Sequence, residues 1–266
     1  MSAAHPTDRL VRYLVDGGAC HGLDRGDHFA RLSAAPWAGG RPTGQRDDPA
    51  SPLLAPCTPS KIVCIGLNYV EHVKESLTVA PGVSAPPSEP LFFFKPPSAV
   101  LGPGQPIVKP DGLVRLDPEG EMALVIGRRA RRVSEADALD HVAGVTAFND
   151  VSARDWQKRD SQWSRAKGSD TFAPLGPCVA LGLDPSDLAL DLSVNGERRQ
   201  HARTSAMHFS PAFLVSWVSR FVTLEPGDVI ATGTPSGIAP IEPGDSVSVS
   251  VEGVGTLTNP VAAETA

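Results

Sequence analysis

The stretch LDPEGEMALVIG at residues 116–127 predicts the strand that organises the rest of the chain. Its apolar run, residues 122–126, is closed by a glycine and a basic turn, as is typical of a strand. Because side chains of a strand alternate between its faces, Glu119 and Glu121 leave the same face, with their Cα atoms about 7 Å apart. Apolar residues follow on both faces. The pattern therefore indicates a strand that is buried on both sides and carries two carboxylates at its start.

Two neighbouring carboxylates on a buried strand repel each other, and burial raises their pKa values unless a cation lies between them. A divalent cation supplies that charge, and ligation by oxygen alone favours Mg²⁺, Mn²⁺ or Ca²⁺ over zinc. The alternative is a solvated strand face, because glutamate is rarely buried. The neighbouring motifs have to decide between these two interpretations.

The composition excludes several classes of protein. The 266 residues are 41% hydrophobic and 20% charged, as in an ordinary folded chain. A net charge of −6, without a basic cluster that also holds aromatic residues, argues against nucleic-acid binding. We find neither a signal-peptide pattern nor an apolar span of about 18 residues, so we expect no membrane association and a reducing, cytoplasmic location. The 26 prolines and 25 glycines indicate many turns and short strands.

The first residues read as a small separate unit. Residues 9–15 and 19–23 flank the turn Asp16-Gly17-Gly18, which predicts a hairpin. A stretch rich in proline, glycine and alanine then reads as a linker. We therefore expect a small N-terminal β domain with its linker at residues 1–56 and a main domain at residues 57–266.

A helix predicted at residues 69–76, with Asn68 as its N-cap, carries a possible proton-transfer pair. His72 and Glu75 lie three residues apart, on one face of this helix and within reach of each other. In such a pair the carboxylate orients the imidazole. An exposed helical pair is the alternative.

Asn149 and Asp150 stand at the end of a strand predicted at residues 144–148, and Ser152 is expected to cap the helix that follows. A carboxylate at a strand end, beside a helix N-terminus, is a common place for a ligand. Ordinary helix capping is the alternative. Lys95, at the end of a strand predicted at residues 91–94, would either meet an anion or face water.

Two loops carry further polar groups. The loop predicted at residues 162–177 contains Arg165 and Lys167, which would balance an acidic metal site, hold a substrate carboxylate or face solvent. The glycine-rich loop at residues 232–237 matches neither a phosphate-binding loop nor GxGxxG, so we reject a nucleotide site there. Its backbone amides and the Thr234 hydroxyl would suit a carboxylate or an oxyanion.

These pieces, in this order, resemble the fumarylacetoacetate hydrolase family. The resemblance runs from about residue 61 to the C-terminus, and the first sixty residues are similar to the small N-terminal unit of bacterial members through Ala35-Pro36-Trp37. Each motif is modest, whereas the ordered set is specific. The matching motifs are IVCIGLNY (62–69) with His72 and Glu75, FFKP (93–96), EGE (119–121), NDVSARD (149–155), RAK (165–167), PLGP (174–177), VNGE (194–197), GDVI (227–230) and TGTP (232–235).

The resemblance implies a β-rich α+β fold, with a mixed β-roll, peripheral helices and the small N-terminal β unit, usually in a homodimer. It implies that Glu119, Glu121 and Asp150 hold Mg²⁺ or Mn²⁺. The ion would chelate a small anionic 2-oxo acid or its enol and stabilise the charge of the enolate. His72 and Glu75 match the acid–base dyad of the family. The other positions that match substrate-contacting residues are Lys167, Gln157, Thr234 and, more weakly, Lys95.

One position departs from the family pattern. Some acylpyruvase-like members have arginine where this chain has Leu67, and the loss of that cation weakens the fit to a small dianion such as oxaloacetate. Bacterial enzymes acting on longer dioic or aromatic-derived acids fit better, among them 2-hydroxyhepta-2,4-diene-1,7-dioate isomerases. Arg154 or Arg165 would compensate for the missing charge.

Three reactions of the family share one enolate. They are hydrolysis of a C–C bond between carbonyls, isomerisation and decarboxylation. Because His72 and Glu75 keep the groups that activate water, we favour a metal-dependent hydrolase of a β-diketo or acylpyruvate-type acid. The alternatives are an isomerase (tautomerase) of a 2-hydroxy-diene dioate in aromatic catabolism and an oxaloacetate-type decarboxylase. A non-catalytic binding module would be favoured by the loss of a metal carboxylate, and none is lost.

Overall fold

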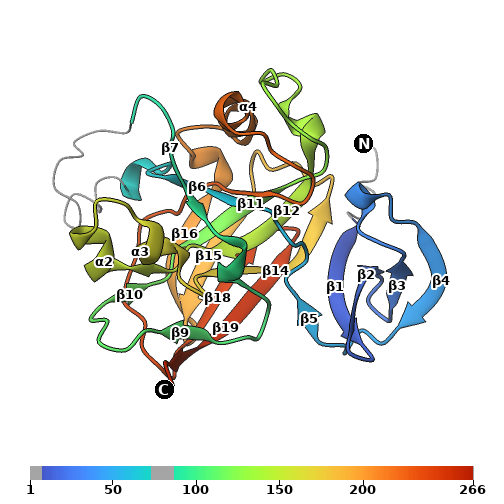
Figure 1. Ribbon diagram of the computed structural model, residues 1–266, viewed down its shortest axis with the longest axis horizontal. Coiled ribbons are helices and arrows are strands. Elements are labelled where there is room, and N and C mark those ends of the chain that lie inside the picture. The colour runs from blue at the N-terminus through green and yellow to red at the C-terminus, as the bar shows by residue number, and fades with distance from the viewer. Residues whose placement is uncertain (1–7, 73–86, 266) are drawn as a thin grey trace.

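The computed structural model describes residues 8–72 and 87–265, which fold mainly into β-strands (Figure 1). Within these ranges, twelve strands form the larger sheet. Two of them, β5 (Leu53–Leu54) and β8 (Val100–Leu101), pair with β1 and β14. The others follow one another in the order β4 (Pro42–Asp47), β3 (Phe29–Leu32), β2 (Gly18–Asp24), β1 (Arg9–Val15), β14 (Ala173–Leu181), β12 (Val142–Asn149), β11 (Gly120–Ile126), β17 (Val229–Ala231), β6 (Ile62–Gly66) and β7 (Leu91–Lys95).

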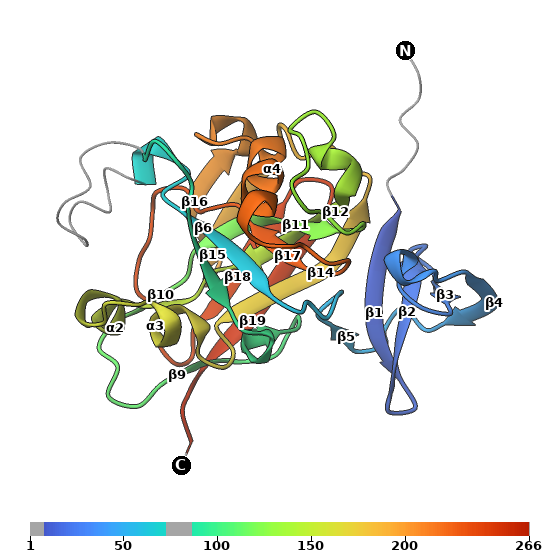
Figure 2. The same cartoon turned by 45° about the horizontal axis from the view of Figure 1, so that its top comes forward.

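Two smaller sheets complete the described part of the chain. One pairs β10 (Leu116–Asp117) with β13 (Ser152–Ala153), and the other has the order β16 (Glu197–Arg203), β15 (Ala189–Val194), β18 (Ser246–Val251), β19 (Gly255–Ala263) and β9 (Ile107–Lys109). Short helices lie at the periphery of the sheets (Figures 1 and 2), which confirms the predicted β-rich fold. They are η1 (Pro36–Ala38), η2 (Pro97–Ala99), η3 (Ala138–His141), α2 (Arg154–Arg159), α3 (Ser164–Gly168), η4 (Thr204–Ala206) and α4 (Pro211–Phe221). Among the described residues, no helix is long and apolar enough to cross a membrane.

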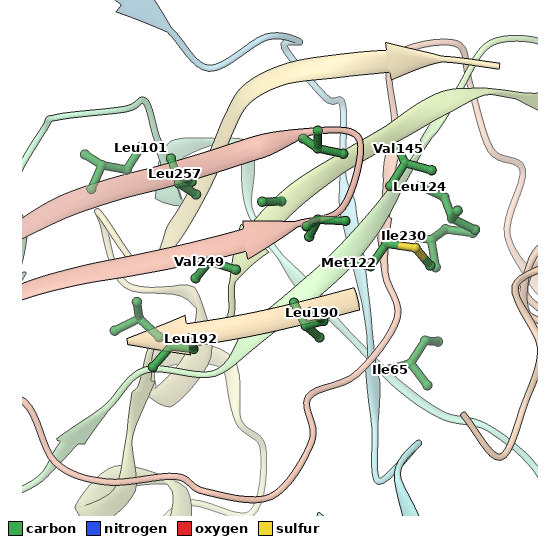
Figure 3. Packing of buried hydrophobic residues seen from close by; sticks show 14 of the residues in the cluster. Ile65, Leu101, Met122, Leu124, Val145, Leu190, Leu192, Ile230, Val249 and Leu257 are labelled. Atoms are coloured by element: carbon green, nitrogen blue, oxygen red, sulfur yellow. The ribbon is translucent and has the colours of Figure 1, made fainter. Parts of the chain in front are cut away.

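Strand β11 lies between the two parts of the hydrophobic core, as the alternating pattern of residues 122–126 predicts. Met122 and Leu124 belong to one cluster, which includes Leu190 and Val249 of the five-stranded sheet (Figure 3). Ala123 and Val125 belong to the other cluster, on the opposite face of the strand. All seven residues of β11 are buried. The strand is therefore buried on both sides, and the two glutamates lie where it begins.

The N-terminal strands continue the larger sheet. The predicted hairpin is confirmed as β1 and β2, and its turn residues Asp16 and Gly17 have φ angles of 50° and 76°. Strand β1 also pairs with β14, through Arg9 opposite Ala180. Strands β1 to β4 lie at one end of the molecule, with α2 and α3 at the other (Figures 1 and 2). The domain boundary after residue 56 stays a prediction.

Two local expectations are wrong. Ser134, with Asp137 three residues on, predicts a capped helix to about residue 142; the Ser134 hydroxyl does accept from the Asp137 amide and donate to its carboxylate, but only the short helix η3 follows. The predicted loop at residues 162–177 contains helix α3 and the first half of β14. Packing against the rest of the protein, which local turn residues do not reveal, orders that segment.

Candidate metal and substrate site

Three carboxylates converge where β11 begins and β12 ends. These strands are antiparallel, and Gly120 pairs with Asn149, so Glu119 and Glu121 on one strand meet Asp150 on the next. Each of the three offers an oxygen atom, and these oxygens all lie within 4.8 Å of one another. The three residues are 4%, 1% and 2% exposed. The structure thus brings together the predicted metal ligands, in a place sheltered from water.

Lys167 of helix α3 joins two of these carboxylates. Its ammonium group donates to Glu119 Oε2 at 2.6 Å and to Asp150 Oδ2 at 2.7 Å. Burial by itself would lower the pKa of Lys167, but the charges of Asp150 and Glu119 outweigh it and raise that pKa above its usual value. The lysine is therefore positively charged at neutral pH.

Lys95 approaches the other oxygen of Asp150 from the end of β7. Its Nζ lies 2.6 Å from Asp150 Oδ1. It donates, however, to the backbone carbonyl groups of Val151, Lys167 and Phe172. An ammonium group has three protons, so this contact with Asp150 is an ion pair without hydrogen-bond geometry. Asp150 Oδ1 accordingly has no hydrogen-bond partner although it is buried.

Arg154, the first residue of α2, supports Glu119 from the other side. Its guanidinium donates to Glu119 Oε1 at 2.5 Å, to Asp117 Oδ2 at 2.9 Å and to Gln157 Oε1 at 2.8 Å. Burial by itself would raise the pKa of Glu119, but the charges of Arg154 and Lys167, and then of His72, hold it well below its usual range. Glu119 is therefore a carboxylate flanked by cations.

Glu121 lacks such compensation. Burial raises its pKa well above the usual range, and the negative charges of Asp150 and Glu119 raise it further. The group that donates to it is the Gly233 amide, at 2.8 Å from Oε2. Gly233 has a φ of 101°, and a Cβ there would come within 2.8 Å of the Asn68 Cβ, so only glycine fits.

Asn68 does not cap a helix, and this expectation is wrong. Its side chain donates to the carbonyl groups of Phe209 and Thr232 and accepts from the Phe209 amide. These bonds fix the segment that precedes His72 against the glycine-rich loop. The expected cap at Ser152 is also wrong, because its hydroxyl donates to the Asp150 carbonyl and Ala153 takes the N-cap position.

The Thr234 hydroxyl is already engaged within the protein. It donates to the Gly120 carbonyl at 2.9 Å and accepts from Gln200 Nε2 at 2.8 Å. Gln200 also donates to the Pro235 carbonyl and accepts from the Gly120 amide. The glycine-rich loop is therefore tied to the residue that separates the two glutamates. In this arrangement the hydroxyl has no proton left for the substrate carboxylate that the resemblance implies.

His72 lies in the same cavity as the carboxylates. It is helical together with Val70 and Glu71, it is 6% exposed, and it lies close enough to Glu119 that its protonated form would lower the pKa of that carboxyl. Glu75 falls outside the described residues, so the acid–base dyad stays a prediction. The position of His72 nevertheless places an imidazole beside the carboxylate cluster.

The cavity has a volume of about 150 Å³, and side chains of two kinds line it. Those that are charged or polar are the three carboxylates, His72, Arg154, Lys167, Gln157 and Thr234. The largest apolar side chains, which we call the apolar wall, are Ile65, Leu67, Leu91, Phe93, Trp163 and Ile238. The Phe93 ring also lies 5.2 Å from Lys167 Nζ, as in a cation–π contact.

The residues of this site fit a divalent cation. The donor set consists of carboxylate oxygens, as Mg²⁺ and Mn²⁺ prefer. Asp150 Oδ1 is a buried acceptor without a hydrogen bond, and the raised pKa of Glu121 marks a place that lacks positive charge. A divalent cation would satisfy both groups.

The structure thus brings the predicted site residues together, except for Glu75, which lies outside the described residues. Lys95 lies behind Asp150 and does not line the cavity. Sequence reasoning assigned no role to Asp117 or Gln200, although both are buried and bonded to site residues. The alternation Asp117, Glu119, Glu121 carried a signal for the first of these, and we see none for Gln200.

Comparisons with known proteins agree with this geometry. The mitochondrial oxaloacetate tautomerase fahd2 of Xenopus laevis is 42% identical over 222 residues, which are 79% of this chain and 68% of that protein. The crystal structure of 2-hydroxyhepta-2,4-diene-1,7-dioate isomerase from Mycobacterium marinum has a TM-score of 0.88 and 42% identity, covering 98% of this chain and 100% of that one. Maleylpyruvate hydrolase from Sphingobium sp. SYK-6, solved with manganese(II) and pyruvate, has a TM-score of 0.77 and 28% identity, covering 97% and 100%.

Family matches cover almost the whole chain. Residues 8–56 match the family described as Rv2993c-like, N-terminal. Residues 61–262 match the family described as fumarylacetoacetate (FAA) hydrolase C-terminal, which includes the whole carboxylate site. The chain therefore belongs to the fumarylacetoacetate hydrolase family, and it is an enzyme of that family.

Proposed function

We propose that this enzyme moves a proton at the carbon next to the oxo group of a small 2-oxo acid, in a keto–enol tautomerisation or double-bond isomerisation that depends on Mg²⁺ or Mn²⁺. The observation that carries this proposal is the convergence of three buried carboxylates with His72 and Lys167 in one cavity. The activities of the tautomerase and the isomerase above are of this kind.

The charge balance of the site favours a doubly negative ligand. Four acidic and four basic side chains form one connected cluster, so their charges cancel when all are ionised. A divalent cation adds two positive charges. The carboxylate and the enolate oxygen of a 2-oxo acid together supply two negative charges. The cluster consists of Asp117, Glu119, Glu121 and Asp150 with Lys95, Arg115, Arg154 and Lys167.

Each part of the cavity has a role in this proposal. Glu119, Glu121 and Asp150 would hold the metal ion, which when bound polarises an oxo group as a Lewis acid. His72 would take the proton from the substrate carbon and return it at another position. Lys167 would stabilise negative charge on a substrate oxygen, because it is buried and charged. The apolar wall, with Phe93 and Trp163, would keep water away from the reacting carbon.

Hydrolysis of a C–C bond is the second candidate, and it is the reaction that the sequence alone favours. The manganese-bound neighbour is a hydrolase, and His72 stands where it could activate a water molecule. Apart from the charged groups around the carboxylates, however, the cavity wall is mostly apolar and offers few partners for such a water. That feature is why we place proton transfer first.

A panel of substrates in D₂O separates these reactions. Protein stripped of divalent cations is given Mn²⁺ or Mg²⁺ and then oxaloacetate, a 2-hydroxymuconate-type diene or an acylpyruvate. We expect metal-dependent loss of the enol or diene absorbance and incorporation of deuterium next to the oxo group by NMR, without shorter acids. Two shorter acids from the acylpyruvate would establish hydrolysis instead. A lack of any metal-dependent change would refute both functions.

A further inference from the structure

Asp117 is a completely buried carboxylate outside the metal-binding triad. It is the last residue of β10, which pairs with β13 so that Asp117 stands opposite Ser152. Arg115 donates to both of its oxygens, at 2.8 Å and 2.9 Å. Arg154 donates to Oδ2 at 2.9 Å. The side chain has neither contact with the cavity nor an assigned role.

Arg154 connects Asp117 to the site. Its guanidinium group is planar and rigid, so a bond from Nε to Asp117 also sets the direction of its two remaining arms. One arm donates to Gln157 Oε1 at 2.8 Å and the other to Glu119 Oε1 at 2.5 Å. A single anchor at Asp117 thereby orients two side chains of the cavity wall.

The same bond limits the charge that Arg154 places on Glu119. Lys167 binds one oxygen of Glu119 and Arg154 binds the other, so both compete with a metal ion for this carboxylate. Asp117 shares the positive charge of Arg154. Without that share, Arg154 would pair more tightly with Glu119 and compete more strongly with the metal ion, so Glu119 would become a poorer ligand.

Asp47, at the far end of the molecule, has the same pairing of a carboxylate with an arginine, but that arginine does not contact the metal site. Arg31 donates to both of its oxygens at 2.6 Å, and the Tyr13 hydroxyl donates to Oδ2 at 2.6 Å. Asp47 ends strand β4, at the edge of the larger sheet (Figure 1). Asp47 and Arg31 are only partly buried, but their pairing has no link to the metal site, so Asp47 provides the control.

We propose that Asp117 is a positioning residue of the metal site, and that it acts through Arg154 on the metal ligand Glu119 and on Gln157. This inference rests on the metal site of the proposed function. It adds that part of the metal affinity is set by a carboxylate that does not touch the ion. Such indirect partners commonly change metal affinity by about 10- to 100-fold.

The test compares Asp117→Asn with Asp47→Asn by calorimetric titration with Mn²⁺ alone, together with melting of the metal-free proteins. Both substitutions remove a carboxylate from an arginine cluster, so both should lower the melting temperature. We expect Asp117→Asn to weaken Mn²⁺ binding by about tenfold or more, and Asp47→Asn to change it by less than about twofold. Equal affinity in wild type and Asp117→Asn would overturn the inference and leave the proposed function standing.

A double-mutant cycle tests the route through Arg154. In the Arg154→Met background, which leaves Arg115 on Asp117 and Lys167 on Glu119, Asp117→Asn should change Mn²⁺ affinity by less than about twofold. An equal loss in both backgrounds would overturn the proposed route. If Asp117→Asn does not fold, Asp117→Glu takes its place in the cycle, because its longer side chain keeps the charge but displaces the guanidinium. A wild-type protein that binds no Mn²⁺ would overturn the inference together with the proposed function.

Discussion

The N-terminal strands and the carboxylate site each hold a carboxylate paired with arginine or lysine, partly buried in the first and buried in the second, but the hydrogen bonds of these groups are completed to different degrees. In the N-terminal strands, Tyr13 and Arg31 occupy both oxygens of Asp47. At the site, Asp150 Oδ1 has no hydrogen-bond partner, and neither has the Tyr69 hydroxyl, whose pKa is raised by burial and by the charge of Glu121. These two are the only buried side-chain oxygen or nitrogen atoms without one in the part of the chain that the structure describes.

This difference distinguishes a cluster that only stabilises the fold from a site that binds a ligand or an ion. A buried polar group without a partner costs about 1–3 kcal/mol, so it persists where another function requires it. The Asp47 cluster needs nothing more, and the pKa of that carboxyl lies below its usual value because Arg31 donates to it. The pKa of Glu121 is instead pushed upward by burial and by its two carboxylate neighbours. Glu121 therefore lacks a neighbouring positive charge of the kind that Arg31 gives to Asp47.

The largest expected effect is on Mn²⁺ affinity and concerns Glu121; its absence would remove the contrast between the two regions. We expect Glu121→Gln to weaken Mn²⁺ binding by more than about 100-fold in calorimetry, because one of three ligand carboxylates is lost. The metal-free variant should melt at the same temperature as wild type or higher, since a buried carboxyl with little compensation has been made neutral. Asp47→Asn should behave in the opposite way, with a lower melting temperature and unchanged Mn²⁺ affinity. Undiminished binding by Glu121→Gln would remove this residue from the metal site.

The second prediction separates proton transfer from metal binding. His72→Asn should lower kcat by about 10²- to 10⁴-fold, because a positioned acid–base group typically contributes that much. Affinity for Mn²⁺ should stay within about twofold of wild type, since His72 lies beside the carboxylates and is not one of them. His141 provides a control outside the cavity, and His141→Asn should leave kcat unchanged. Normal turnover by His72→Asn would discard its role in catalysis.

The third prediction concerns pH. Glu121 has a raised pKa in the folded protein, so between its unfolded value, near 4.5, and its folded value the native state holds the proton that the unfolded chain has lost. The metal-free protein should therefore lose stability as the pH rises through this window. Saturation with Mn²⁺ should remove the loss, because the cation favours the ionised carboxylate, and Glu121→Gln should remove it without metal. Melting temperatures measured across this pH range would test the direction of the change. The prediction would be contradicted if the metal-free wild type gained stability as the pH rises while Glu121→Gln did not.

The fold and the ligand set could be predicted to a considerable extent from the sequence. The alternation at residues 122–126 identified a strand between two apolar layers, and it placed Glu119 and Glu121 on one face. Asp150 was joined to the two glutamates only through the family resemblance, because the residues alone do not indicate that β12 pairs with β11. The preference for hydrolysis depended on His72 and Glu75, and the cavity wall does not add support for it.

Local signals failed where the partners lie far away in the chain. Asn68 looked like a helix cap, but its side chain binds Phe209 and Thr232, which are 141 and 164 residues away. Lys95 looked like a residue that faces water or an anionic ligand, whereas it is buried, forms an ion pair with Asp150 and donates to three carbonyl groups contributed by later segments. No local pattern indicates that such carbonyls will converge on one ammonium group.

The smallest expected effect is a change in stability, and it comes from a comparison of the two tyrosines of this chain. Both are buried, but the Tyr13 hydroxyl donates to Asp47 and the Tyr69 hydroxyl has no partner. Tyr13→Phe should lower the melting temperature, since it leaves Asp47 with one donor fewer. Tyr69→Phe should stabilise the metal-free protein by up to about 1 kcal/mol, because it removes a polar group that burial leaves unsatisfied.

The response of Tyr69→Phe to metal then decides why the unpaired hydroxyl persists. Burial raises the pKa of Tyr69, and the charge of Glu121 raises it further, so this hydroxyl lies within the electrostatic reach of the carboxylates. If it donates to a group that arrives with the metal ion, the increase in melting temperature on addition of Mn²⁺ should be smaller in Tyr69→Phe than in wild type and unchanged in Tyr13→Phe. Equal increases in all three proteins would show that the unpaired hydroxyl has no connection with metal binding, and the contrast between the two regions would then rest on the carboxylates alone.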